Sequence, residues 1–316
     1  MIFLAIIFLL LTNIFTIYIL KRKEIKSYFI KSKIQSVNLE KLDKIFENEK
    51  ITDNLFRPKE ETIIKSFCTN LGDKDIIGKT SDYEAWIISS LSKKSKNIFE
   101  FGTCSGKTTT LMAINSPDDA KIVTLTINLN QAKNLDLDEG DNKTSIRNII
   151  NESRYEKFIF SGKKYENKIE VKFLDSRKLD TSPYRNKFDL IFIDGLHTYK
   201  QVKKDINNSL KIIKENGIIL LHDCFPRNYY YQAVPRCQIN WNGDTWKALV
   251  EKRTDSNLDV YCLNADEGIG VILKRKNKNF LNLDIKNFAK LKYSDYSKNY
   301  KEYLNLIEYD DFLKII

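Results

Sequence analysis

The chain has 316 residues, of which 42% are hydrophobic and 12% aromatic, with a formal net charge of +10. This apolar content supports a substantial core and excludes a wholly disordered chain. The basic residues are scattered and no nucleic-acid-binding motif accompanies them, so we expect no nucleic-acid partner. The five cysteines are widely spaced and form no CxxC pair, which suggests neither a zinc site nor a disulfide framework.

The first twenty residues predict a membrane anchor. Met1 to Leu20 contain no charged side chain and are mostly apolar. About 20 apolar residues in a helix span the hydrocarbon core of a bilayer. Lys21, Arg22 and Lys23 follow at once, and positive charge favours the cytoplasmic side. We therefore predict a single-pass membrane protein with its catalytic part in the cytoplasm; an uncleaved signal or a buried core helix are the alternatives.

The rest of the chain divides by its composition and its pattern of apolar residues. Residues 21–75 are charged and predict a helical linker that leads into the catalytic part. Residues 76–275 alternate between strand-like and helix-like segments, which predicts an α/β domain with a mostly parallel sheet. Residues 276–316 are rich in Lys, Tyr and Asn and predict a helical tail.

Within this domain, the strands are expected to be short apolar segments. The five that should run parallel are residues 98–101, 121–127, 169–174, 188–193 and 217–221. Helices are expected at residues 108–114 and 199–213, and a terminal hairpin at residues 258–263 and 269–273. In such sheets ligands bind at the carboxyl ends of the strands. The polar side chains expected there belong to Glu100, Asn128, Asp175, Ser176, Asp194, His197, His222 and Asp223.

The turn after the first of these strands separates two classes of enzyme. Gly102 and Gly106 enclose three residues, whereas a phosphate-binding P-loop needs four before its Gly-Lys-Thr. The pattern acid-x-Gly-x-x-x-Gly, with Glu100 as the acid, is instead the first motif of class I methyltransferases that use S-adenosylmethionine. A P-loop-like nucleotide enzyme and a non-catalytic, membrane-anchored cofactor-binding protein stay open as alternatives.

Three blocks together carry a family resemblance. They are FEFGTCSGKTTT, KFDLIFIDGLHTYKQVKKD and IIKENGIILLHDC, in this order. Residues 76–275 thereby resemble the class I methyltransferases of the methyltransferase-24 group. The fold implied is a Rossmann-like, seven-stranded, mostly parallel sheet ending in an antiparallel hairpin, here preceded by one transmembrane helix.

The resemblance also implies a cofactor site for S-adenosylmethionine. The turn between Gly102 and Gly106 would hold the methionine carboxylate at a helix N-terminus, and Glu100 would meet the amino end, directly or through water. An acid normally binds the ribose hydroxyls, but Asn128 stands at that position and lacks the charge. The full set of expected cofactor-binding residues is Glu100, Gly102, Thr103, Ser105, Gly106, Asn128, Asp175, Ser176 and Asp194.

The only two histidines follow neighbouring strands, each next to an aspartate. Imidazole, with a pKa near 6.5, suits removal of a proton from a hydroxyl at neutral pH. The resemblance makes His197 the base, with Asp194 and His222 as further catalytic residues. It also makes Asp194 and Asp223 candidate ligands of a divalent cation such as Mg²⁺.

The sequence therefore predicts an S-adenosylmethionine-dependent methyltransferase. The expected reaction is O-methylation of a small-molecule or glycan acceptor near the membrane. A homo-oligomer is compatible with the sequence. A loop over the acceptor is expected from Phe225 to Trp246, and it contains Tyr229, Tyr230, Tyr231, Arg236, Trp241 and Trp246.

Overall fold

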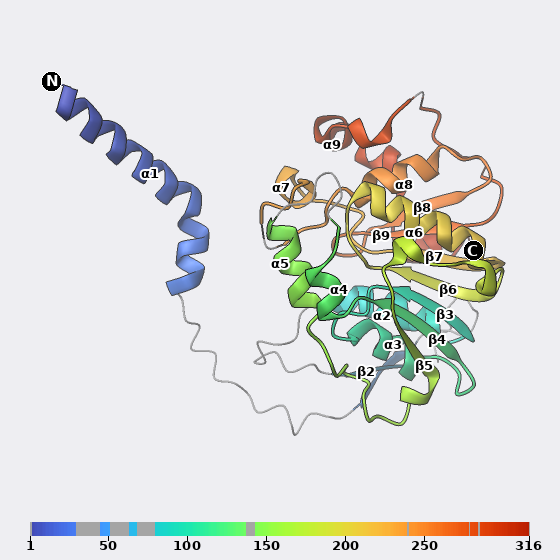
Figure 1. Ribbon diagram of the computed structural model, residues 1–316. Coiled ribbons are helices and arrows are strands. Elements are labelled where there is room, and N and C mark those ends of the chain that lie inside the picture. Colours follow the sequence, from blue (N-terminus) through green and yellow to red (C-terminus); the bar gives the residue numbers. More distant parts are fainter. Residues whose placement is uncertain are drawn as a thin grey trace.

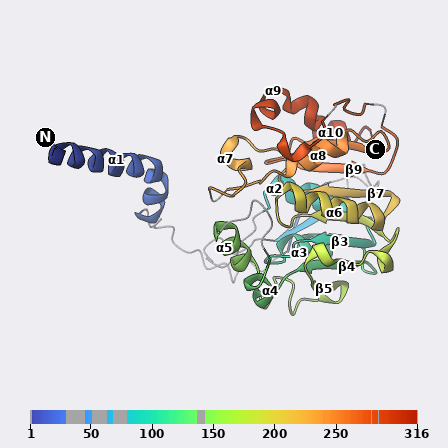
Figure 2. The ribbon, with the colours of Figure 1, turned by 45° about the horizontal axis from the view of Figure 1, so that its top comes forward.

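The computed structural model describes residues 2–29, 45–50, 63–67, 80–136, 143–238, 240–277, 279–283 and 285–315. The described residues from 80 onward form an α/β body in which helices cover both faces of one sheet (Figures 1 and 2). This arrangement is the Rossmann-like fold expected from the alternating sequence pattern.

The sheet has eight strands among the described residues, in the order β10-β8-β9-β7-β6-β3-β4-β5. Its central strands β5, β4, β3, β6 and β7 run parallel, whereas β9 pairs antiparallel with both β7 and β8. The strands are β3 (Asn97–Phe101), β4 (Lys121–Thr126), β5 (Ile169–Phe173), β6 (Phe188–Ile193), β7 (Ile213–Leu221), β8 (Asp259–Leu263), β9 (Ile269–Leu273) and β10 (Leu306–Ile307).

The central strands are buried on both faces because their apolar residues are consecutive rather than alternating with polar ones. In β6 every residue but Asp189 is buried, and the last five residues of β7 are buried too. Asp189 is only partly buried, and its carboxylate accepts hydrogen bonds from the backbone N–H groups of Lys96 and Asn97, at the start of β3.

The helices fall into two layers. On one face, α2 and α3 pack together and α10 joins them; on the other, α6 packs against α8, with α9 beyond it. These and the shorter helices are α2 (Asp82–Ser92), α3 (Lys107–Asn115), α4 (Leu129–Lys133), α5 (Lys143–Glu152), α6 (Tyr199–Ile212), α7 (Tyr229–Gln232), α8 (Thr245–Arg253), α9 (Tyr293–Leu304) and α10 (Tyr309–Phe312). Figures 1 and 2 both place α5 and α7 at the same end of the body.

The sequence predicts a seven-stranded sheet, but the sheet has eight strands among the described residues. Asn305 ends α9 in the left-handed conformation, and the two residues after it form β10, which pairs parallel with β8. The tail therefore extends the sheet at its edge and then continues into α10. The sequence signal for a two-residue strand is too short to detect, because a strand is normally identified from several alternating or apolar residues.

The N-terminal segments include one helix and a small separate sheet. The helix α1 (Ile2–Phe29) covers the residues predicted as an anchor, and β1 (Ile45–Lys50) pairs antiparallel with β2 (Ile63–Phe67). In the part of the chain that the structure describes, no helix is both long and apolar enough to cross a membrane. This finding corrects the predicted transmembrane helix, together with the membrane localisation and cytoplasmic orientation that were based on it.

Candidate active site

A cavity of about 580 Å³ opens at the carboxyl ends of the parallel strands. It is bordered by the turn after β3, by the ends of β4, β5, β6 and β7, by α5, and by the loop before α8. Its lining residues are Thr80, Phe101, Gly102, Cys104, Leu125, Thr126, Ile127, Leu135, Ser145, Asn148, Ile149, Glu152, Ser153, Leu174, Asp175, Ser176, Arg177, Asp194, Gly195, Leu196, His197, Gln201, His222, Asp223, Arg236, Asn240 and Trp241. This volume suits a ligand of cofactor size.

The two glycines of the turn after β3 have different surroundings. Gly102 lines the cavity at φ +99°, and a Cβ built on it would lie 2.0 Å from the carbonyl oxygen of Asp194. Only glycine therefore allows the two chain segments to approach so closely. Gly106, at φ +81°, precedes α3 and packs against Phe160, outside the cavity lining. The first glycine thus shapes the cavity, whereas the second permits packing behind it.

Glu100 lies behind the cavity wall and not on it. Its side chain is fully buried, and one carboxylate oxygen accepts hydrogen bonds from the hydroxyls of Thr109 and Thr124. Burial raises the pKa of Glu100 to about 8, although both hydrogen bonds act in the opposite direction. The structure does not place this carboxylate where it could meet the amino end of a cofactor directly.

The other predicted residues of the first two turns are not on the lining either. Thr103 is buried and its hydroxyl lies 2.6 Å from that of Thr124, and Ser105 is also buried. Asn128 is exposed and caps α4: its side chain accepts from the backbone N–H of Gln131, which bonds back to Asn128. This reciprocal pair explains the residue as a helix start. The wall nearby is made by Thr126 and Ile127.

Asp175 and Ser176, predicted near the adenine, do line the cavity. Asp175 is already paired with Arg177, whose guanidinium lies 2.7 Å from it. Burial alone would raise the pKa of Asp175, but hydrogen bonds from Arg177 lower it. The hydroxyl of Ser176 accepts from Gln201, which also contacts Asp205 in the buried side of α6. This end of the cavity is therefore polar and held by bonds between its own residues.

The two histidines and two aspartates meet at the opposite end, as the sequence predicted for neighbouring strands. The Nε2 of His197 lies 3.1 Å from Asp194 Oδ1, and its Nδ1 lies 3.1 Å from Asp223 Oδ2. The Nδ1 of His222 lies 3.2 Å from Asp194 Oδ1 and 3.4 Å from Asp223 Oδ1. We call these four residues the His/Asp cluster.

Backbone bonds between strands fix the positions of this cluster. The N–H of Asp194 donates to Phe101 at the end of β3, and the N–H of His222 donates to Ile193 at the end of β6. Both residues thus continue the ladder of the sheet by one position. Asp223 has a left-handed backbone at φ +58°, which Asp tolerates better than most residues. That turn points its carboxylate back toward His197.

The charges of the cluster depend on one another. Burial would lower the pKa of His197, but hydrogen bonds and charges from Asp194 and Asp223 raise it to about 9. For His222 the same aspartates and Glu84 outweigh burial and hold its pKa well above the usual value. Burial would raise the pKa of Asp223, but His222 and His197 lower it well below the usual range. The two aspartates therefore favour the protonated form of both imidazoles.

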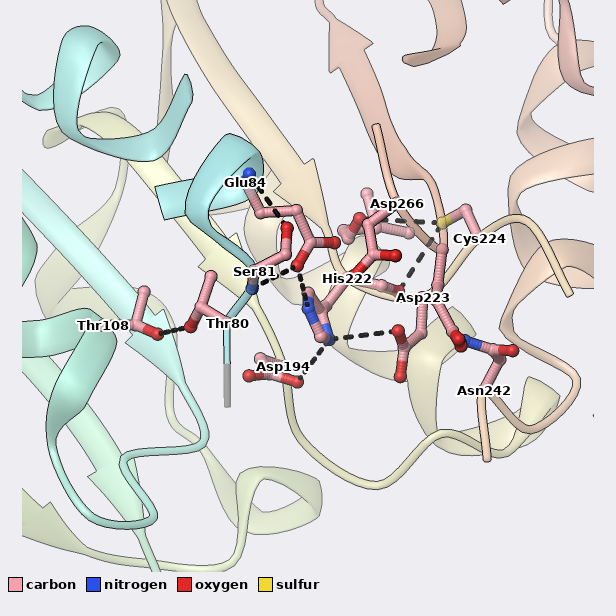
Figure 3. A network of polar contacts seen from close by, with 12 residues as sticks. Thr80, Ser81, Glu84, Thr108, Asp194, His222, Asp223, Cys224, Asn242 and Asp266 are labelled. Carbon is pink, nitrogen blue, oxygen red and sulfur yellow. Dashed lines mark hydrogen bonds and ion pairs between the residues drawn. The ribbon is translucent and has the colours of Figure 1, made fainter. Parts of the chain in front are cut away.

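Sequence reasoning missed Glu84, which joins the cluster from α2. Its Oε2 lies 3.3 Å from Nε2 of His222 (Figure 3). Glu84 also completes a capping box with Ser81, in which each residue bonds the backbone N–H of the other. The spacing Ser-x-x-Glu signals this helix start in the sequence. No local signal predicts the contact with His222.

The acceptor side of the cavity was predicted only as an aromatic and basic loop. Trp241 stacks near His197, with ring centroids 6.1 Å apart and planes 19° apart. The Arg236 guanidinium lies over the Trp241 ring, 5.3 Å from its centroid. Glu152 of α5 lines the same wall, and burial raises its pKa although Arg236 and His197 act in the opposite direction. Nothing in the sequence signalled Glu152.

The His/Asp cluster does not fit the predicted Mg²⁺ site. Mg²⁺ requires near-octahedral oxygen coordination and keeps several waters. Among the described residues, the group whose donor atoms lie within 4.8 Å of one another is Asp194, His197 and His222, which supplies two nitrogens and one oxygen. Asp223 instead contacts both imidazole rings. We therefore derive no step through Mg²⁺.

The P-loop alternative also finds no support at this turn. In a P-loop the lysine reaches the phosphates. Lys107 Nζ instead donates to the carbonyl oxygen of Thr80, at 2.8 Å, and Lys107 is not part of the cavity lining. The lysine therefore joins α3 to the segment that leads into α2.

A family model described as a methyltransferase domain matches residues 99–224, which include every strand end of the cavity. These residues form a methyltransferase domain. Over these residues, the match confirms the predicted resemblance to class I, S-adenosylmethionine-dependent methyltransferases and the predicted methyltransferase activity. No curated protein matches the chain in sequence.

Several solved methyltransferases are similar to this chain at low sequence identity. PaMTH1 of Podospora anserina, with S-adenosylhomocysteine bound, is 20% identical with a TM-score of 0.45, over 63% of this chain and 80% of that one. TomG of Streptomyces achromogenes, an O-methyltransferase of tomaymycin synthesis in complex with SAM, is 14% identical with a TM-score of 0.43, over 62% and 82%. The Bacillus cereus O-methyltransferase in complex with SAH is 16% identical with a TM-score of 0.42, over 62% and 83%. No residue role is carried over from these structures.

Proposed function

We propose that the methyltransferase domain transfers a methyl group from S-adenosylmethionine to a hydroxyl of a small-molecule or glycan acceptor. The observation that carries the proposal is that one cavity extends from the glycine turn at Gly102 to the His/Asp cluster. A methyl donor and an acceptor must be held in line and in contact, and a shared cavity with two chemically different ends allows this.

The proposed cofactor position follows from the lining. The methionine end lies at Gly102 and Cys104, and the adenine end at Asp175 and Ser176. Asp194 belongs to the His/Asp cluster and its backbone lies against Gly102, so it is the residue best placed to contact both ligands. Glu100 and Asn128 are left out of this proposed contact set, because neither lines the cavity.

The acceptor is proposed to bind between the His/Asp cluster and Trp241. When bound, S-adenosylmethionine supplies an electrophilic methyl group: the acceptor oxygen forms the C–O bond as the C–S bond breaks, and the electron pair stays on sulfur. The cluster orients the hydroxyl, and His197 is the proposed base that receives its proton. His197 can act as the predicted base only after losing the proton that Asp194 and Asp223 hold on it. Trp241 and Arg236 offer a flat, cationic wall to the rest of the acceptor.

Calorimetric titration of the full-length chain with S-adenosylmethionine tests the cofactor, and release of S-adenosylhomocysteine with a panel of phenols, catechols and sugars tests the transfer. We expect Gly102→Ala to abolish binding, because its Cβ would meet the backbone of Asp194. Gly162→Ala is the matched control: Gly162 also has a positive φ, but its Cβ would meet nothing within 4 Å. No binding by the wild-type chain would overturn the proposal.

A second outcome separates catalysis from binding alone. If the wild-type chain binds the cofactor and Asp194→Asn reduces transfer without reducing that binding, the cluster takes part in the reaction. If the chain binds the cofactor but releases no product with any acceptor, and Asp194→Asn behaves identically, the non-catalytic alternative is favoured.

A further inference from the structure

Three donor atoms of the His/Asp cluster have the spacing of metal ligands. Asp194 Oδ1 lies 3.1 Å from His197 Nε2 and 3.2 Å from His222 Nδ1. Around a metal with bonds of about 2.1 Å, adjacent donor atoms lie roughly 3.0–3.4 Å apart. The group as a whole keeps its donor atoms within 4.8 Å of one another. The three side chains thus already have nearly the spacing that coordination requires.

The remaining ring nitrogens point to the same conclusion. His197 Nδ1 lies 3.1 Å from Asp223 Oδ2, and His222 Nε2 lies 3.3 Å from Glu84 Oε2. Metal-binding histidines usually present one nitrogen to the ion and the other to a carboxylate that orients the ring. Both histidines of this chain have that arrangement, with carboxylates supplied by two different elements. Figure 3 shows it for His222 and Glu84.

One nitrogen facing the centre of the group lacks a well-formed hydrogen bond. His222 Nδ1 is buried and has close carboxylate oxygens, but none in hydrogen-bonding geometry. A buried polar atom without a hydrogen-bond partner destabilises the folded protein, and a ligand at that atom would remove this cost. An ion between His222 and Asp194 would provide one.

The donor types decide which ion fits. Two imidazoles and one carboxylate suit borderline divalent transition metals such as Zn²⁺, whereas Mg²⁺ prefers oxygen alone. We propose that the chain binds one divalent transition-metal ion through Asp194 Oδ1, His197 Nε2 and His222 Nδ1, with Asp223 and Glu84 orienting the imidazoles. No cysteine is part of this site. An ion at this position would take the place of the proton on each coordinating nitrogen, and it would acidify an acceptor hydroxyl as a Lewis acid instead of a base at His197. This role rests on the proposed function, but the binding does not.

The test is metal binding by the full-length chain without S-adenosylmethionine. Chelator-treated protein is dialysed against ZnCl₂ or MgCl₂ and its metal content is measured. We expect one zinc ion per chain and no retained magnesium. His197→Ala and His222→Ala should each weaken zinc binding by more than about 100-fold, and Glu84→Gln, which changes only an orienting group, by about 10- to 100-fold. Cys237→Ser controls for an exposed thiol and should leave zinc binding unchanged.

A second measurement needs no variant and so does not depend on how the histidine variants fold. The chain has only two histidines, and both belong to the proposed site. Titration with paramagnetic Co²⁺, followed by NMR of the imidazole protons, should shift or broaden both histidines together at one equivalent. The inference is overturned if the imidazole signals do not respond, or if magnesium competes equally with zinc. A chain that binds S-adenosylmethionine but no zinc would overturn this inference and leave the proposed function standing.

Discussion

His222 Nε2 lies 3.3 Å from Glu84 Oε2, although 138 residues separate the two in the sequence. The contact joins the first turn of α2 to the residue that follows β7. Because Glu84 is also the reciprocal partner of the Ser81 cap, the start of α2 and the orientation of His222 depend on the same carboxylate.

Glu84→Ala should therefore destabilise the protein more than Ser81→Ala. Removing the Ser81 hydroxyl costs the cap alone, about 1 kcal/mol. Removing the Glu84 carboxylate also leaves buried His222 without its partner at Nε2, which adds about 1–3 kcal/mol. Chemical denaturation of both variants at one pH measures the difference. Equal losses would mean that the carboxylate acts only as a helix cap.

The buried carboxyl of Glu100 makes the stability of the protein depend on pH. The pKa of Glu100 is about 8 in the folded chain against an ordinary value of 4.5, so between these values the folded state holds a proton that the unfolded state has lost. The free energy of unfolding should then fall as pH rises through this window, by up to about 1.4 kcal/mol per pH unit. Below pH 4.5 both states are protonated and this contribution is flat.

Glu100→Gln tests this, because the amide keeps an oxygen that accepts from Thr109 and Thr124 and cannot ionise. The variant should lose most of the slope of unfolding free energy against pH between pH 5 and pH 8, measured by urea denaturation. Asp180→Asn is the control, since Asp180 is an exposed acid away from the core. Parallel curves for wild type and Glu100→Gln would contradict the prediction.

Gly243 lies against the backbone of His197 and should tolerate no side chain. A Cβ at Gly243, where φ is +62°, would lie 1.7 Å from the carbonyl oxygen of His197. Gly162→Ala, at φ +74° with open space around it, measures the cost of the backbone conformation alone, about 1–2 kcal/mol. Gly243→Ala should lower the melting temperature further and should also reduce methyl transfer, because Trp241 and His197 would move apart. Equal effects of the two substitutions on melting and turnover would refute this packing argument.

The parallel strands could be predicted from the sequence because their cause is local. A run such as Phe188–Ile193 is apolar at nearly every position, and only a strand covered on both faces buries it completely. The contact between His197 and Asp223 could be predicted from these strands, since the carboxyl ends of neighbouring parallel strands lie at the same edge of the sheet. What the sequence showed was therefore the framework and the residues attached directly to it.

The parts that could not be predicted depend on contacts made from outside that framework. Glu100 follows the family motif, but its burial depends on hydroxyls of Thr109 and Thr124, which reach it from α3 and β4. The position of Asn128 after a strand predicts a ribose contact, whereas in the structure its side chain pairs with Gln131 in a capping box at the start of α4. Glu152 enters the cavity from α5, and no spacing in the sequence relates it to the strand ends.

The C-terminal helix α10 should be an essential part of the fold rather than an appendage. Phe312 is fully buried and its ring contacts Tyr261 of β8, with centroids 5.7 Å apart. Phe312→Ala should lower the free energy of unfolding by about 3–5 kcal/mol. The substitution leaves an empty space between the edge of the sheet and α2, and the surrounding residues cannot easily move in to fill it. Ile315→Ala is the matched control: Ile315 is 44% exposed, so its loss should change stability by less than about 0.5 kcal/mol. Denaturant titrations of the two variants decide the matter, and similar midpoints would show that α10 packs too loosely to support the edge of the sheet.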